Sequence, residues 1–257
     1  MNETLEQNIR LTGRLAVVTG AARGNGEAIA RGLAAHGARV VVTDLDLEAV
    51  SDVAADIQAA GGVAFAYQLD VRSPAACSDL ASQVMREAGE VSILVNNAGV
   101  LHKSDPRSGD FAASIERQLA VNVLGYANMV HAFVAHLEKT RGNIINIASV
   151  MSFVALQGSS GYAASKGAVK QLTAGLALDL AASGVRVNAV APGFIETAMS
   201  EVSRSDRSIY ERRLQQIALG RFGLPSELIG PVLFLASEMS SYVTGTTLTV
   251  DGGYLAM

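Results

Sequence analysis

The sequence contains a single cysteine, Cys77, no tryptophan and no excess of basic residues. One cysteine excludes a disulfide within the chain, which is typical of proteins in a reducing compartment. The 20 Lys and Arg residues are outnumbered by 24 Asp and Glu residues, and the formal net charge is −4. Because nucleic-acid binders use surplus positive charge to neutralise phosphates, this composition argues against a nucleic-acid partner.

Long hydrophobic runs and metal-ligand clusters are also missing. The longest apolar stretch, around residues 229–236, is far shorter than the roughly 18 residues that cross a membrane. Residues 1–7 have neither the basic segment nor the apolar segment of a signal peptide. The histidines have no Cys or His partners at metal-binding spacing. We therefore expect a cytoplasmic protein with no membrane partner and no metal.

The chain is rich in hydrophobic residues (49%), and short β-branched runs alternate with helical segments along its whole length. The predicted strands are residues 14–19, 39–43, 63–69, 91–95, 143–148, 185–190 and 246–250. The predicted helices are residues 24–36, 45–60, 74–88, 110–137, 162–182 and 225–236. This alternation predicts an α/β, Rossmann-like fold, a doubly wound parallel sheet of about seven strands with helices on both faces. No linker divides the chain, so we expect one domain over residues 1–257, with residues 1–10 as a loose extension.

A glycine-rich turn, with Gly20, Gly24 and Gly26, joins the first predicted strand to the first predicted helix. Glycines at such a turn let the backbone approach a pyrophosphate, and the helix N-terminus offers free N–H groups. The spacing is G-x-x-x-G-x-G rather than G-x-G-x-x-G, and a glycine-rich turn also fits simple chain reversal. Its position between strand and helix favours dinucleotide binding.

Asp44 closes the second predicted strand, where a carboxylate accepts hydrogen bonds from the adenosine ribose and repels a 2′-phosphate. Asp44 therefore favours NAD, whereas Arg23 in the glycine turn favours NADP, which remains the alternative. Asp44 also fits a helix cap. Asp70, with Val71, ends the third predicted strand, where it would bond the adenine amino group or simply form a turn.

Three residues that suit proton transfer follow the fifth predicted strand. Ser149 comes directly after that strand, and Tyr162 and Lys166 share one face of the next predicted helix. Oxidation of an alcohol releases a hydride, which a nicotinamide accepts, and a proton, which the protein must accept. A nearby ammonium lowers the pKa of a tyrosine from its usual value near 10, so we expect Lys166 to make Tyr162 a base.

Two further polar residues complete this expected site. Ser149 would donate a hydrogen bond to the substrate oxygen, and Asn122, inside a predicted helix, would hold a water that links Lys166 to solvent. Taken singly, each residue also fits a structural role: a solvated Tyr/Lys pair, a turn cap, or an amide that satisfies a neighbouring carbonyl.

Together these motifs resemble the short-chain dehydrogenase/reductase family of the Ser-Tyr-Lys type, over roughly residues 11–254. The matching segments are TGAARGNG (19–26), Asp70, NNAG (96–99), Asn122, Ser149, YAASK (162–166), RVNAVAPG (186–193) and VTGTTLTVDGGY (243–254). The resemblance implies Tyr162 as general acid/base and Lys166 as its partner and binder of the nicotinamide ribose. It implies Ser149 as the residue that orients the substrate oxygen and Asn122 as a fourth catalytic residue.

The resemblance also implies a set of cofactor-binding residues. They are Gly20, Arg23, Gly24, Asn25, Gly26, Asp44, Asp70, Val71, Asn97, Ala98, Gly99, Tyr162, Lys166, Pro192, Gly193, Ile195 and Thr197. The family often has Ile or Leu where this chain has Asn25, so we expect a polar group near the phosphates on the nicotinamide side.

The resemblance also places substrate contacts after the fifth and sixth predicted strands and in a mobile segment beyond Gly193. The expected substrate residues are Ser149, Met151, Phe153, Tyr162 and Phe194, with Val154, Leu156 and Met199 as apolar and His102, Ser152 and Gln157 as polar neighbours. Residues 200–213 contain Arg204, Arg207, Arg212 and Arg213 among acidic residues. We interpret this segment as an amphipathic helix with a solvated face, and the alternative is a lid whose arginines bind an anionic substrate.

The sequence thus predicts an NAD-dependent oxidoreductase that interconverts a secondary alcohol (polyol, sugar, hydroxy acid or cyclic alcohol) and its ketone. The alternatives are an NADP-dependent ketone or 3-oxoacyl-type reductase, a non-catalytic dinucleotide-binding sensor and a nucleotide-sugar epimerase. Small residues along the predicted helix 162–182 permit close helix approach, and the resembling family commonly forms tetramers or dimers, so we expect a homotetramer.

Overall fold

The computed structural model describes residues 8–257, without the side chains of residues 202 and 203. Residues 1–7, on which most of the expected N-terminal extension falls, lie outside the described residues. Seven parallel strands form one sheet in the order β3-β2-β1-β4-β5-β6-β7. The strands are β1 (Leu15–Thr19), β2 (Arg39–Asp44), β3 (Val63–Gln68), β4 (Ile93–Asn96), β5 (Asn143–Ile147), β6 (Arg186–Pro192) and β7 (Thr247–Val250). The predicted doubly wound sheet is therefore confirmed, and the strand order reverses between β1 and β4, where ligands bind in such sheets.

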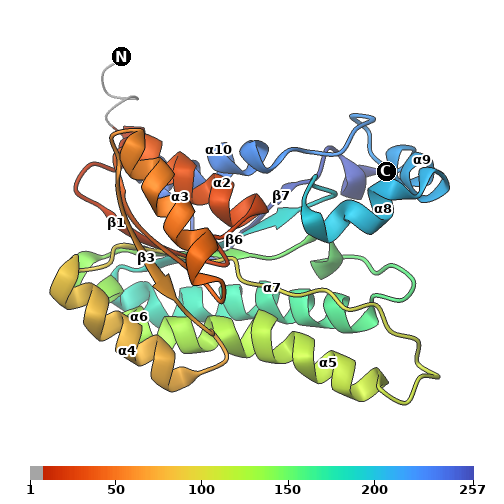
Figure 1. Cartoon of the computed structure of the whole chain (residues 1–257), viewed down its shortest axis with the longest axis horizontal. Helices are drawn as coiled ribbons and strands as arrows, with labels where there is room; N and C mark the ends of the chain where they lie inside the picture. Colours follow the sequence, from red (N-terminus) through yellow and green to blue (C-terminus); the bar gives the residue numbers. More distant parts are fainter. Residues whose placement is uncertain (1–7) are drawn as a thin grey trace.

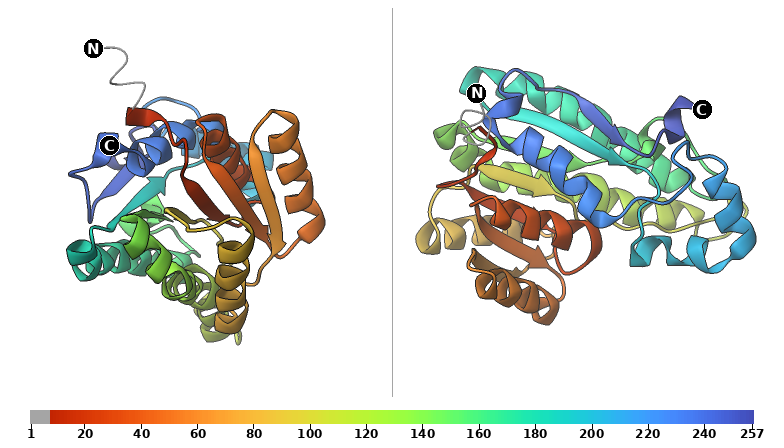
Figure 2. Two further views of the ribbon diagram at one scale, coloured as in Figure 1. Left: turned by 90° about the vertical axis from the view of Figure 1, so that its left-hand side faces the viewer. Right: turned by 90° about the horizontal axis from the view of Figure 1, so that it is seen from above.

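Helices cover both faces of the sheet (Figure 1), and Figure 2 shows the sheet twisting between the two layers. One layer contains α2 (Gly24–Ala35), α3 (Leu47–Ala59) and α10 (Ile229–Ala236), and the other contains α4 (Pro74–Glu87), α5 (Phe111–Leu119), α6 (Gly125–Thr140) and α7 (Ser160–Leu180). Ala16 and Val18 of β1 pack in the first core and Leu15 and Val17 in the second, because successive strand residues point to opposite faces. This is why β1 is buried at every position.

The prediction of one long helix over residues 110–137 is wrong in one respect. A π-helical turn, η1 (Ala120–Leu124), separates α5 from α6. Asn122 lies in this turn and is fully buried. A π turn carries an extra residue and is frequent at functional sites. The interruption directs the Asn122 amide toward the loop after β4, which it hydrogen-bonds.

The amphipathic helix predicted over residues 200–213 is also wrong as a single element. The chain forms a short turn, η4 (Ala198–Ser200), and then two helices, α8 (Glu201–Ser205) and α9 (Arg207–Leu214). Asp206 separates them, and its carboxylate caps α9 by accepting from the backbone N–H groups of Ser208 and Ile209. The predicted helix 225–236 begins as a 3₁₀ turn, η5 (Pro225–Leu228), before α10. The remaining predicted elements end within two residues of the observed ones.

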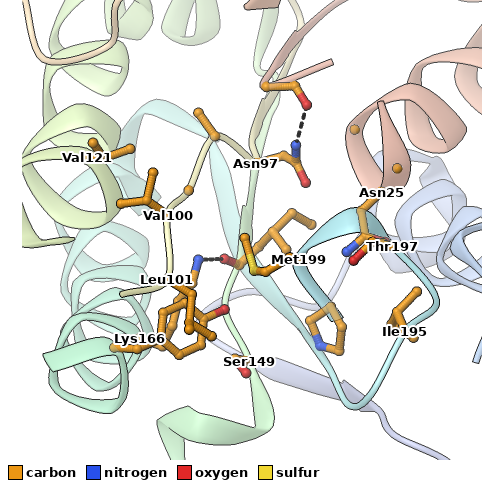
Figure 3. A pocket seen from close by; sticks show the side chains of 18 of the residues that line it. Asn25, Asn97, Val100, Leu101, Val121, Ser149, Lys166, Ile195, Thr197 and Met199 are labelled. Atoms are coloured by element: carbon orange, nitrogen blue, oxygen red, sulfur yellow. Dashed lines mark hydrogen bonds between the residues drawn. The ribbon is translucent and has the colours of Figure 1, made fainter. Parts of the chain in front are cut away.

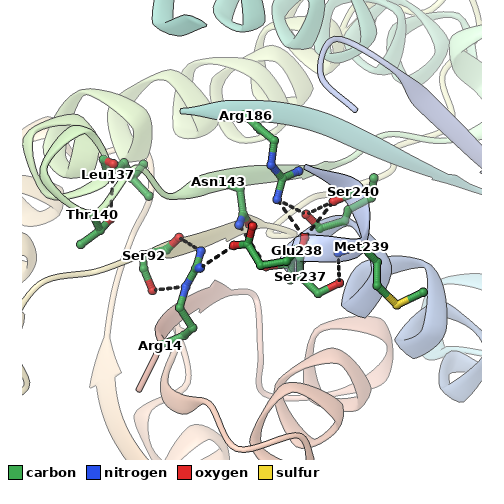
Figure 4. Close-up of polar contacts among 12 residues, drawn as sticks. Arg14, Ser92, Leu137, Thr140, Asn143, Arg186, Ser237, Glu238, Met239 and Ser240 are labelled. Carbon is green, nitrogen blue, oxygen red and sulfur yellow. Dashed lines mark hydrogen bonds and ion pairs between the residues drawn. The ribbon is translucent and has the colours of Figure 1, made fainter. Parts of the chain in front are cut away.

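At the edge of the sheet opposite the carboxyl ends of the strands, polar side chains hold the end of α10 (Figure 4). The Arg186 guanidinium donates to the carbonyl oxygens of Leu235 and Ser237 at 3.0 and 3.2 Å. The Asn143 amide donates to that of Ala236 at 3.1 Å. The last carbonyls of a helix have no partner within it, so these contacts satisfy groups that burial would otherwise leave unpaired. None of the helices in residues 8–257 has the length and apolar character that a membrane span requires.

Candidate active site

The carboxyl ends of the central strands open on a cavity of about 840 Å³ (Figure 3). Its wall includes the glycine turn, the ends of β2 and β4, the loops after β5 and β6, and the start of α7. All the residues expected to bind cofactor line it: Gly20, Arg23, Gly24, Asn25, Gly26, Asp44, Asp70, Val71, Asn97, Ala98, Gly99, Tyr162, Lys166, Pro192, Gly193, Ile195 and Thr197. The fold thus brings residues from most of the chain to one cavity.

The glycine turn has the geometry of an anion cradle. Gly20 and Gly24 have positive φ angles of 63° and 61°, which glycine adopts without strain. A Cβ atom on Gly26 would lie 2.1 Å from the Gly20 carbonyl oxygen, so only glycine fits there. No side chain caps the N-terminus of α2 at Arg23, and its first N–H groups are free to bind a phosphate. This part of the cavity therefore fits a dinucleotide pyrophosphate.

Asn25 adds a polar atom to this cradle, as expected from the presence of Asn where the family often has Ile or Leu. Its Oδ1 atom is buried and has no hydrogen-bond partner in the described part of the chain. A buried acceptor without a partner is costly, and a hydroxyl or amide of a bound ligand would satisfy it.

The Asp44 carboxylate lies beside the glycine turn. It accepts from the backbone N–H of Ala22 at 3.3 Å and from that of Leu45 at 2.8 Å. Asp46, not Asp44, caps α3 by accepting from Ala49. The capping alternative for Asp44 is therefore excluded, and its carboxylate faces the cavity.

The other two polar strand ends have distinct partners. Asp70 is bound by Arg72 at 2.6 Å, and this hydrogen-bonded ion pair lowers the pKa of the carboxyl. The Asn97 amide donates to the carbonyl oxygens of Thr19 and Gly20, both at 2.9 Å. Asn97 thereby ties the end of β4 to the glycine turn, as Figure 3 shows.

Ser149, Tyr162 and Lys166 come together in the wall of the cavity, and all three are more than 90% buried. The Lys166 Nζ atom donates to the Ile147 carbonyl oxygen at 2.7 Å and to the Tyr126 hydroxyl at 3.4 Å. It lies 5.8 Å from the centre of the Tyr162 ring. The ammonium group is thus anchored to β5 and α6 rather than to the Tyr162 hydroxyl.

The expected lowering of the Tyr162 pKa by Lys166 is wrong for this structure. Burial raises the pKa of Tyr162 to about 12, and a hydrogen bond with Ser149 offsets this only in part. Burial also lowers the pKa of Lys166 to about 7. Removing both groups from water disfavours their charged forms, and this effect outweighs their mutual attraction.

Asn122 does not line the cavity. Its Nδ2 donates to the Val100 carbonyl oxygen at 3.0 Å and to the Ser165 hydroxyl at 2.9 Å, and its Oδ1 accepts from the Val100 N–H at 2.8 Å. The expected water-holding role thus has no support in these contacts, because the amide is engaged by Val100 and Ser165. Asn122 is a positioning residue that fixes the loop after β4 and the segment of α7 next to Lys166.

The expected substrate residues divide into two groups. Met151 and Phe194 line the cavity, as do their expected neighbours His102, Leu156, Gln157 and Met199. Phe153 does not, because the 3₁₀ turn η2 (Val150–Ser152) directs it outward, where it is 42% exposed and stacks under Lys170. Val154 and Ser152 also lie outside the wall, and Ser152 donates to the Lys166 carbonyl oxygen at 2.7 Å.

Sequence reasoning missed three residues of this region. Tyr126, which contacts Lys166, lies four residues after Asn122, and that same-face spacing was the available signal. Lys103 and Arg117 line the cavity without any sequence pattern that marks them. Of the four arginines in residues 200–213, only Arg213 lines it. Within residues 8–257, no group of three or more His, Cys, Asp or Glu side chains is arranged to hold a metal ion.

Comparisons with known proteins agree with this geometry. Over residues 20–255 the chain matches the family described as enoyl-(acyl carrier protein) reductase. It is 42% identical over 248 residues to the galactitol 2-dehydrogenase (L-tagatose-forming) of Cereibacter sphaeroides, covering 95% of this chain and 96% of that one. It is 36% identical over 244 residues to the gluconate 5-dehydrogenase of Gluconobacter oxydans, covering 95% of each. Among solved structures, a gluconate 5-dehydrogenase of Burkholderia cenocepacia in complex with NADP and tartrate matches with a TM-score of 0.94 and 35% identity, covering 98% of this chain and 99% of that one.

Proposed function

The chain belongs to the short-chain dehydrogenase/reductase family, and we propose that it is an NAD-dependent dehydrogenase of polyhydroxylated secondary alcohols, with Tyr162 as general acid/base. Membership makes it an enzyme that uses a nicotinamide dinucleotide on CH–OH groups. The observation that carries the proposal is the joint presence of Ser149, Tyr162 and Lys166 in the wall of the cavity that contains the glycine turn. A binding protein without turnover would need the glycine turn alone.

The residues of this chain divide the proton chemistry among them. In the oxidation, Tyr162 takes the proton of the substrate hydroxyl, and a nicotinamide dinucleotide held in the cavity would supply the hydride acceptor. Ser149 donates a hydrogen bond to the substrate oxygen, which carries developing negative charge. Lys166, held by the Ile147 carbonyl, favours the phenolate form of Tyr162 when it is protonated. In the reduction, Tyr162 returns the proton to the alkoxide oxygen.

Asp44 supports NAD as the cofactor of this chain. Its carboxylate faces the cavity beside the glycine turn, where it accepts ribose hydroxyls and repels a 2′-phosphate. The relative from Burkholderia cenocepacia holds NADP, and Arg23 in this chain favours that cofactor, so the two residues oppose each other. We propose that Asp44 prevails, because its carboxylate is held in place by the Ala22 and Leu45 N–H groups, whereas the Arg23 side chain is exposed to solvent.

Initial rates with NAD and NADP test this choice. We expect kcat/KM to favour NAD by about 5- to 30-fold, the effect of a charge repulsion of about 1–2 kcal/mol. Asp44→Ala should reduce that preference, whereas Asp46→Ala, which removes the neighbouring carboxylate that caps α3, should leave it unchanged. A wild-type preference for NADP would contradict the proposal.

The relatives support polyols and sugar derivatives as the substrate class, since two of them are named for galactitol and gluconate. A panel of polyols and sugar acids with NAD, followed by absorbance of the reduced cofactor, tests this directly. Acetoacetyl-CoA with NADPH in the same panel tests the 3-oxoacyl reductase alternative. Preference for acetoacetyl-CoA would refute the polyol assignment.

Tyr162→Phe tests the catalytic assignment. Loss of the hydroxyl should lower kcat by about 10²–10⁴-fold, the usual contribution of a general acid/base, while binding of the reduced cofactor stays within a few-fold. Tyr242→Phe is the matched control, because Tyr242 is fully exposed and outside the cavity. Equal turnover in the two variants would exclude the proton-transfer role of Tyr162.

A further inference from the structure

The cavity wall is charged differently at its two ends. Its only acidic residues within the described chain, Asp44 and Asp70, lie where β2 and β3 end. The segments nearest Ser149 and Tyr162 contribute Lys103, Arg117 and Arg213 and no carboxylate. The region where the substrate must lie is therefore electropositive.

Two of these cations lie on the side of the cavity next to the start of α7. The loop that carries Lys103 is fixed there, because the Ser104 N–H donates to the Gly158 carbonyl oxygen at 3.1 Å. Arg117, on α5, has Asp110 at 3.5 Å as a partly exposed partner. Lys103 and Arg117 raise the potential at the entrance, but neither is held rigidly enough to define a binding geometry.

Arg213, on α9, is different in its surroundings. Its guanidinium carbon lies 5.3 Å from the centre of the Phe194 ring, and Phe194 lines the cavity directly after Gly193. Its guanidinium donates a hydrogen bond to the neutral Gln216 side chain at 2.9 Å. Within residues 8–257 no carboxylate lies within 4.0 Å of it. The ring face attracts the guanidinium cation, and its charge has no carboxylate partner in the described part of the chain.

The neighbouring arginines have carboxylate partners instead. Arg204 pairs with Glu201, and Arg207 pairs with Glu211 at 2.8 Å. Neither Arg204 nor Arg207 lines the cavity. Burying a cation without a counter-charge is costly, and burial lowers the pKa of Arg213 accordingly. An anionic ligand would recover that cost.

We propose, on the basis of the proposed function, that the alcohol substrate carries a terminal carboxylate and that Arg213 binds it. Carboxylate and guanidinium are both planar, so the Arg213 guanidinium, which lies over the Phe194 ring, can bind a carboxylate through two parallel N–H groups. The two relatives named above differ in this group: galactitol ends in a hydroxymethyl group, whereas gluconate carries a carboxylate. Galactonate is the acid that corresponds to galactitol. Arg213 is then a specificity-determining residue that selects the acid.

Matched substrates test this assignment by kinetics. With saturating NAD, kcat/KM for galactonate should exceed that for galactitol by about 10- to 100-fold, the range of a charge-assisted pair. Arg213→Gln should raise KM for galactonate by a similar factor, with kcat and the constants for galactitol little changed. Arg212→Gln is the control, because Arg212 is exposed and outside the cavity wall. Equal loss on galactonate and galactitol in Arg213→Gln, or no loss on either, would overturn the assignment.

A binding measurement keeps this test independent of turnover. Calorimetry on the enzyme saturated with NADH compares tartrate with threitol, its neutral counterpart. We expect tartrate to bind more tightly and to lose that advantage in Arg213→Gln only. Tighter binding of tartrate without oxidation of any polyol would keep the role of Arg213 and refute the proposed function. If the enzyme oxidises galactitol, Tyr162→Phe abolishes that oxidation and galactonate is no better a substrate, the proposed function is kept and the role of Arg213 is refuted. Preference for galactitol 6-phosphate over galactonate would identify a phosphate as the anion and refute the carboxylate.

Discussion

Substitution of Gly26 by alanine tests whether the glycine turn holds the cofactor through its backbone. A Cβ atom at this position would lie 2.1 Å from the Gly20 carbonyl oxygen and 2.5 Å from the Asn97 Nδ2 atom. Ordinary carbon–oxygen contacts are longer than 3 Å, so the turn must open by about 1 Å. The atom that must move is backbone, and it also accepts the hydrogen bond from Asn97. The variant therefore changes the shape of the cradle itself.

The magnitude follows from the cost of overpacking. An added methyl group in a tightly packed place costs about 1–3 kcal/mol. For a chain of 257 residues this corresponds to a fall in Tm of roughly 2–12 °C. A displacement of about 1 Å also misaligns several N–H groups that would face the pyrophosphate, and we expect cofactor affinity to fall by about 100-fold or more.

Two measurements separate these effects. Differential scanning calorimetry gives the change in Tm. Fluorescence titration with NADH, at a temperature well below the Tm of both the wild type and the variant, gives the change in Kd. Gly109→Ala is the matched control, because a Cβ atom there meets nothing within 4 Å and the residue lies outside the cavity. It should bind NADH as the wild type does. If Gly26→Ala also binds NADH within threefold of the wild type, backbone cradling by this turn is the wrong explanation.

Three further outcomes are expected. Oxidation needs the deprotonated form of Tyr162, and burial raises the pKa of Tyr162 to about 12. The rate of alcohol oxidation should therefore rise between pH 7 and pH 10, while the rate of ketone reduction should not. An oxidation rate that falls over this range contradicts the assignment of Tyr162 as the base. Tyr126→Phe removes a hydroxyl that lies 3.4 Å from the Lys166 Nζ atom. The variant should lower kcat by roughly tenfold and shift the pH profile of kcat. A change in Tm with an unaltered pH profile would mean that Tyr126 has only a structural role. Light scattering should give a homotetramer, in which the Leu178 side chain, 81% exposed on α7, is covered; a monomer refutes this.

The sheet could be predicted from the sequence because every central strand is buried on both faces. A strand such as Leu15–Thr19 is buried at every position and apolar at all but the last, the pattern of a strand covered on both faces. The glycine turn was visible for a related reason. Glycine adopts the positive φ values of Gly20 and Gly24 without strain, so the sequence there indicates the geometry directly.

The parts that could not be predicted depend on contacts between distant segments. The π turn at Asn122 depends on Val100, a residue in the loop after β4. The outward turn of Phe153 and the break at Asp206 are decided by local hydrogen bonds in irregular segments, where hydrophobic periodicity has no information. The raised pKa of Tyr162 has the same origin, because burial, which only the folded chain defines, outweighs the charge of its neighbour.

The positions of these contacts explain how the chain separates its chemistry from its selectivity. Lys166 is held from two sides, by the Ile147 carbonyl and the Tyr126 hydroxyl, and the adjacent Ser165 is bound by the Asn122 amide. These partners belong to β5, the π turn and α6, so the proton-transfer groups are fixed by the scaffold. Arg213, in contrast, belongs to α9, where Tyr210 packs against Phe222 and Arg213 lies over the Phe194 ring. A change in α8 or α9 can therefore alter which alcohol is bound without moving Tyr162, which is consistent with relatives of one fold being named for different substrates.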